Sequence, residues 1–67
     1  MIEDWYSFVH VGARGEERDP GVYPGLDAVK AACLDRAGCV LAWEEQDGVL
    51  SARGATGVFV VELVYAE

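Results

Sequence analysis

Basic residues are scarce in this chain of 67 residues. It has five, of which only Lys30 is a lysine. Its twelve acidic residues bring the net charge to −7. Phosphate backbones and anionic lipid surfaces repel such a chain, so we expect no direct binding to nucleic acid and none to membranes. The charge suits a protein partner with a basic surface, although it also serves solubility alone.

Long apolar runs and a basic leader are missing as well. No segment approaches the ~20 apolar residues of a membrane helix. The first residues, MIEDWY, are acidic where a secretory signal is basic. We therefore expect a cytoplasmic protein with reduced cysteines, in a bacterium or a phage-infected host cell. Repeats, linkers and low-complexity segments are also lacking, so residues 1–67 are predicted to form a single domain.

Cysteine and histidine are too few and too widely spaced for the usual metal or nucleophile sites. Cys33 and Cys39 are six residues apart and His10 is distant, whereas structural zinc sites use closely spaced pairs. A catalytic thiolate needs an exposed, electropositive setting, and Cys33 falls on the predicted buried side of a helix. Glu44 and Glu45 point to opposite faces of a strand and form no acid–base dyad. We predict no catalytic residue, no metal, no cofactor and no enzymatic activity.

Apolar side chains, by contrast, make up 52% of the chain, which favours a packed core over disorder. The aromatic and β-branched run Trp5 to Val11 predicts a first strand, and Val22–Tyr23 a short return strand after a long loop. Leu26 to Ala37 predicts the one helix, which Gly38 ends. The apolar stripe of this helix comprises Leu26, Val29, Cys33 and Ala37.

Turn chemistry places the remaining strands. Asp47-Gly48 is typical of a two-residue type I′ hairpin, which pairs Gln46 with Val49 and Trp43 with Ala52. A second turn at Gly54 to Gly57 leads into the last strand, Val58 to Tyr65. Period two divides this strand between two faces. We expect Phe59, Val61, Leu63 and Tyr65 under the helix, with Val58, Val60, Glu62 and Val64 on the opposite face.

These elements predict an α+β domain in which a single helix packs on one face of a mostly antiparallel sheet of four or five strands. The order is ββαβββ or βαβββ, and the strand order within the sheet is not predicted. The face turned away from the helix is rich in valine, which indicates an interaction site or homodimer interface. The alternative is that Trp5–Val11 folds across this face and covers it. The candidate interface residues are Val40, Val49, Val58, Val60, Glu62 and Val64.

Three segments resemble a pattern in small proteins of actinobacteria and their phages. They are YPGLDAVKAAC, LAWEEQDGVLSARG and the closing GVFVVELV, and the match covers Tyr23 to Val64. The abundance of alanine, glycine, valine and arginine, with a single lysine, also indicates a GC-rich genome. The shared pattern determines a fold, and those proteins have no settled activity. The resemblance therefore implies a source and a fold and assigns no site.

Two functional hypotheses follow. In the first, a small phage-encoded accessory protein docks on, and inhibits, a host or bacterial protein with a basic surface, as inhibitors that mimic nucleic acid do. An acidic rim would steer that association. In the second, the protein is structural and assembles with itself, for instance in a virion, through the valine-rich face. The acidic rim comprises Glu16, Glu17, Asp19, Glu44, Glu45 and Asp47.

Overall fold

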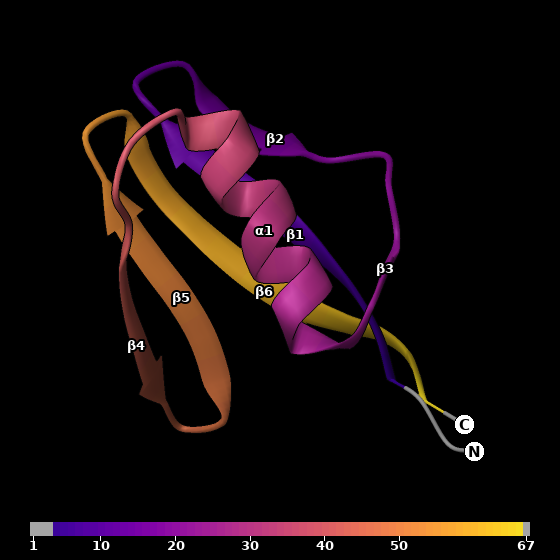
Figure 1. Cartoon of the computed structure of the whole chain (residues 1–67). Coiled ribbons are helices and arrows are strands. Elements are labelled where there is room, and N and C mark those ends of the chain that lie inside the picture. Colours follow the sequence, from indigo (N-terminus) through magenta and orange to yellow (C-terminus); the bar gives the residue numbers. More distant parts are fainter. Residues whose placement is uncertain (1–3, 67) are drawn as a thin grey trace.

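One helix lies across one face of an antiparallel sheet (Figure 1). This computed structural model describes residues 4–66. The elements, in chain order, are β1 (Asp4–Gly12), β2 (Gly15–Arg18), β3 (Tyr23–Pro24), α1 (Gly25–Ala37), β4 (Ala42–Gln46), β5 (Val49–Gly54) and β6 (Gly57–Ala66). The predicted α+β class is confirmed.

The sheet has the strand order β2-β1-β6-β5-β4, and the two-residue β3 pairs with the start of β1. All of these pairings are antiparallel. The first and last long strands, β1 and β6, lie side by side, so β6 is the central strand of the five. The short edge strands are β2 and β4.

Turn chemistry sets the β4–β5 register as expected. Asp47 and Gly48 both have positive φ, at 53° and 78°, as a type I′ turn requires. Gln46 pairs with Val49 and Trp43 with Ala52, which confirms the predicted pairs.

The turn between β5 and β6 depends on Gly57. Its φ is 138°, and a Cβ built there would lie 2.3 Å from the carbonyl oxygen of Val11. Only glycine fits this position without a backbone shift.

The core lies between α1 and the facing side of the sheet. Phe8, Val29, Cys33, Leu41, Ala52, Phe59 and Val61 form its buried cluster. Gly38 ends the helix with φ 67°, and its N–H donates to the Leu34 carbonyl at 2.9 Å. The predicted core positions of Val29, Cys33, Phe59 and Val61 are confirmed.

Two residues expected in this core are exposed. Leu26 is 40% and Leu63 57% exposed. The buried cluster ends at Val29 on the helix and at Val61 on β6. Leu26 lies one helical turn before Val29, and Leu63 is the next residue after Val61 on the same side of the strand. The side chain of Tyr65, which was expected on the same face, lies outside the described residues.

The segment Trp5–Val11 does not fold across the sheet. It forms most of β1 and pairs edge to edge with β6, so the suggestion that it covers the valine-rich face is wrong. The expected loop after it contains a further strand, β2, which forms a tight hairpin with β1 through Gly12 and Gly15. Tyr23 does return to β1, as predicted, and pairs with Tyr6.

Candidate protein-binding face

The side of the sheet opposite α1, here called the outer face, is defined by the strand register, because cross-strand partners share a face. Its first row of side chains runs Glu16, Val11, Val58, Arg53 and Ala42 from β2 to β4. Its second row runs Arg18, Val9, Val60, Ser51 and Glu44. Ser7 beside Glu62, and Val49 beside Gln46, complete it.

Apolar side chains occupy the centre of the outer face. Val9, Val11, Val58 and Val60 lie on its two middle strands, β1 and β6, and the charged residues lie on β2, β4 and β5 and at Glu62 on β6. Val9 is buried at 8% exposure, whereas Val11 is 36% and Val49 48% exposed. An antiparallel sheet with a solvated face usually carries polar side chains there. This face has a valine centre instead.

An ion pair crosses part of this face. The guanidinium of Arg18 on β2 donates to the carboxylate of Glu62 on β6, across the strand that carries Ser7 and Val9. That hydrogen bond, with the negative charge of Glu62, raises the pKa of Arg18. The crossing accounts for the burial of Val9, and Ser7, at 4% exposure, donates its hydroxyl to the Asp19 carbonyl at 3.3 Å.

One predicted interface residue lies elsewhere, and another is unpaired at a bulge. Val40 precedes β4 in the connection from α1 and is 89% exposed, so it is not on the outer face. Val64 has no partner in β1, because Tyr6 pairs with Leu63 and Trp5 with Tyr65 around a bulge. Val49, Val58, Val60 and Glu62 do lie on the outer face.

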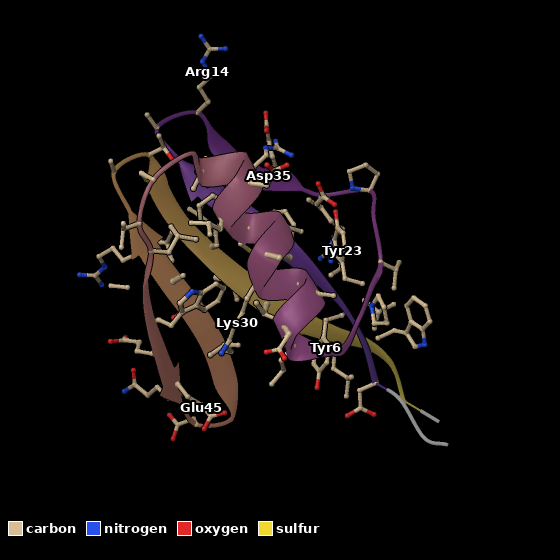
Figure 2. The ribbon with its side chains drawn as sticks, viewed as in Figure 1. Tyr6, Arg14, Tyr23, Lys30, Asp35 and Glu45 are labelled. Atoms are coloured by element: carbon tan, nitrogen blue, oxygen red, sulfur yellow. The ribbon has the colours of Figure 1, made fainter. Side chains whose placement is uncertain are left out.

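The acidic residues predicted as a rim are divided between the two edges of the sheet. Glu16 and Glu17 lie on β2, whereas Glu44 and Glu45 lie on β4 and Asp47 in the turn after it. Figure 2 shows Glu45 near the β4–β5 turn and Arg14 at the opposite end, in the β1–β2 turn. Neighbouring glutamates on each strand point to opposite faces. The six residues therefore do not form one continuous surface.

Asp19 is committed to contacts within the chain. Its carboxylate accepts hydrogen bonds from the Tyr23 hydroxyl at 2.6 Å, the Gly21 N–H at 2.9 Å and Arg36 at 3.4 Å. Its backbone N–H donates to the Phe8 carbonyl at 3.0 Å. The side chain is 13% exposed. Asp19 thus ties the loop between β2 and β3 to β1 and to the helix.

The other acidic side chains of the predicted rim differ in whether they form an ion pair. Glu17 accepts a hydrogen bond from Arg36 at 2.8 Å. Among the residues that the structure describes, no ion pair involves Glu44, Glu45 or Asp47. The free acidic charge of the predicted rim is therefore concentrated at the β4 end.

Cys33 and His10 occupy structural positions. Cys33 is fully buried, and burial raises the pKa of its thiol to about 11. The His10 ring stacks on Phe59 with centroids 4.6 Å apart, and its Nε2 lies 3.1 Å from the Thr56 carbonyl oxygen. Within the described part of the chain, no three histidine, cysteine or acidic side chains are grouped as metal ligands would be.

A second apolar surface lies between α1 and β4. It is a hollow of about 350 Å³ lined by Lys30, Ala31, Leu34, Val40, Leu41 and Trp43. The Lys30 ammonium lies 5.5 Å from the Trp43 ring centroid, and Figure 2 shows Lys30 on the β4 and β5 side of the helix. Sequence reasoning missed this hollow, because Leu34 lies off the helix stripe and Val40 was assigned to the sheet.

Sequence reasoning also missed Val9, Val11 and Arg18 as members of the outer face. Arg18 was assigned to a loop, and the valines were assigned to a first strand whose place in the sheet was not predicted. The pattern that places them is the Gly12-Ala-Arg-Gly15 turn, which folds β2 back along β1.

The fold and the site together define a two-layer α+β domain with one sheet face that no described element covers. In comparisons with protein-family models, curated proteins and solved structures, the chain has no match. No helix within residues 4–66 has the length and apolarity needed to span a bilayer. What the outer face binds must follow from its own residues.

Proposed function

We propose that this protein is a non-enzymatic binding module that contacts another protein surface through the outer face. The observation that carries the proposal is the valine centre of that face, Val9, Val11, Val58 and Val60, with charged residues around it. Clustered apolar side chains on an open face, rimmed by polar groups, are typical of interaction sites. The outer face has a hollow of about 180 Å³ beside Ser51, Arg53 and Val58. It is smaller than the ~300–1,000 Å³ of a typical ligand pocket, so the face suits another protein surface better than a small ligand.

The titratable groups also favour binding over catalysis. Burial raises the pKa of the Cys33 thiol to about 11. Burial also raises the pKa of Tyr6, and the hydrogen bond to Asp19 raises the pKa of Tyr23. A thiol or phenol that acts as a nucleophile or general base needs the opposite, a pKa lowered toward the working pH.

A direct test compares two substitutions of the same kind. Val60→Asp places a carboxylate at the centre of the outer face, whereas Val40→Asp places one on an exposed residue off that face. The wild-type chain and both variants are immobilised and exposed to cell extract that also contains a tagged copy of the same chain. We expect Val60→Asp, and not Val40→Asp, to lose bound protein. Equal capture by all three, with circular dichroism showing each folded, would refute the proposal.

A second candidate function is docking on a basic protein surface through the β4 end, as an accessory or inhibitory protein of a bacterium or phage. The observation that favours it is the free acidic charge of Glu44, Glu45 and Asp47, in a chain of net charge −7. Such charge raises association rates and selects partners more than it adds affinity. Acidic residues on an edge strand also prevent edge-to-edge aggregation, which is reason enough for their presence. The outer face therefore remains the stronger candidate.

A further inference from the structure

We infer that the occupant of the outer face is a second copy of this chain, in a two-fold dimer whose axis runs along β6. The inference rests on the proposed function of that face and adds the identity of the partner. It is carried by the distribution of charge across the face, which is complementary to itself when the axis runs along β6.

The second row of the outer face carries opposite charges at its two ends. Arg18 lies at the β2 end and Glu44 at the β4 end, each two strands away from the central Val60. In a two-fold dimer that packs face to face, the symmetry axis lies in the interface. With an axis parallel to β6 through Val60, β2 of one copy lies against β4 of the other. Arg18, which also pairs with Glu62 of its own chain, then faces Glu44 of the second copy, and this contact occurs twice.

An axis through Val60 and perpendicular to the strands fails the same charge test. It places β2 on β2 and β4 on β4, so that Arg18 faces Arg18 and Glu44 faces Glu44. Like charges held opposite each other oppose association. The first row of side chains is compatible with the axis along β6. This axis brings Arg53 of one copy over Val11 of the other, next to Glu16.

The remainder of the molecule disfavours self-contact elsewhere. Among residues 4–66, the outer face holds two basic residues, Arg18 and Arg53, and three acidic ones, Glu16, Glu44 and Glu62, whereas the other surfaces carry three basic and seven acidic residues. Most of the net charge of these residues therefore lies on other surfaces, where a second copy meets stronger repulsion. The two Glu62 carboxylates would meet across the axis, and Arg18 of the same chain neutralises each of them.

The size of the face sets the expected strength. Five strands about 4.8 Å apart, with about five residues along each, give a flat area of about 300 Å². Over the two copies this is about 600 Å², which is the size of a weak, transient contact, so the dimer should be readily reversible, with Kd on the order of 10 to 100 µM.

Glu44 and Glu45 provide a matched test, because these neighbours on β4 are both exposed and point to opposite faces. Sedimentation velocity of the full chain, from about 1 to 300 µM so as to bracket that Kd, measures the dimer. We expect Glu44→Arg to weaken it at least about tenfold by placing two arginines together at both ends of the interface. Glu45→Arg makes the same change in net charge, and we expect a change below about threefold. Equal effects of the two, or no effect of either, would overturn the proposed arrangement.

The Val60 and Val40 variants separate the failure of this inference from the failure of the proposed function. We expect Val60→Asp to be monomeric and Val40→Asp to remain dimeric. Because aspartate could disturb the central strand, Val60→Thr, which keeps the shape and the β propensity of valine, should weaken the dimer while the circular dichroism stays unchanged. A wild-type monomer at every concentration refutes the second copy alone if capture of another protein still depends on Val60. Loss of both results refutes both proposals.

Discussion

Replacing Asp19 by alanine should destabilise the protein strongly, although an aspartate in a polar loop would ordinarily be a tolerant position. The substitution removes the acceptor for the Tyr23 hydroxyl at 2.6 Å and for the Gly21 N–H at 2.9 Å. Hydrogen bonds to a charged group contribute about 1.5–3 kcal/mol each when their loss leaves a partner unsatisfied. The contact with Arg36 is long and adds less than about 1 kcal/mol.

Partial exposure of the loop lets water replace some of these contacts, so we expect a total loss of about 2–4 kcal/mol. A chain of this size has a total stability of only about 3–10 kcal/mol. The measurement is urea unfolding followed by tryptophan fluorescence and by circular dichroism. The matched control is Glu17→Ala, which removes the exposed carboxylate on the same arginine and should cost less than about 1 kcal/mol.

A double-mutant cycle with Tyr23→Phe isolates the central hydrogen bond. This substitution keeps the ring, which stacks on Phe8 with centroids 6.0 Å apart, and removes only the hydroxyl. We expect a coupling of about 1–2 kcal/mol between the two positions. The hydrogen bond to Asp19 raises the pKa of Tyr23, so Asp19→Ala should also lower that pKa in an ultraviolet titration. Additivity within about 0.5 kcal/mol, with an unchanged tyrosine pKa, would refute the assignment of Asp19 to this role.

Two further predictions concern the turn before β6 and the buried thiol. Gly57→Ala should destabilise the fold by about 1–3 kcal/mol in urea unfolding, because its φ of 138° and the Val11 carbonyl leave no room for a Cβ; an unchanged midpoint would count against this geometry. Between pH 9 and 11 the Cys33 thiol ionises in the unfolded chain and stays protonated in the folded one. The contribution of this thiol to the free energy of unfolding is therefore present below pH 9 and is lost as the pH rises through the folded pKa of about 11. This loss of stability is up to about 2–3 kcal/mol. A Cys33→Ala variant, although less stable at neutral pH, should show a shallower decline in the free energy of unfolding over this range. Parallel pH profiles of the two proteins would contradict this prediction.

Much of the helix-side geometry could be predicted from local patterns. Asp47-Gly48 fixed the pairing of β4 with β5, because a type I′ turn permits one register. Period two then placed Phe59 and Val61 in the core and Val58 and Val60 outside it. The burial of Cys33 was predicted from its place in the helix stripe, and this burial explains the raised pKa of its thiol.

The candidate site was less predictable, because its charged members come from a strand without a strand pattern. The β2 sequence, Gly15–Arg18, has no apolar alternation and all four residues are exposed, as in a protective edge strand. Arg18 therefore looked like part of a loop, although it lies across from Glu44 on the outer face. Asp19 looked like a surface charge, and only its partners Tyr23 and Gly21 show that it is structural.

The sequence alone determined the fold class, the helix, the β4–β5 register and the division of the last strand between two faces, since each depends on residues within one turn or one strand. Tertiary structure decided that β1 pairs with β6 at the centre of the sheet, because contacts between opposite ends of a chain leave no local pattern. That pairing turned Trp5–Val11 from a possible cover into a neighbouring strand. It left the outer face open and set Arg18 and Glu44 at opposite ends of one row, where the charges of a second copy can meet them.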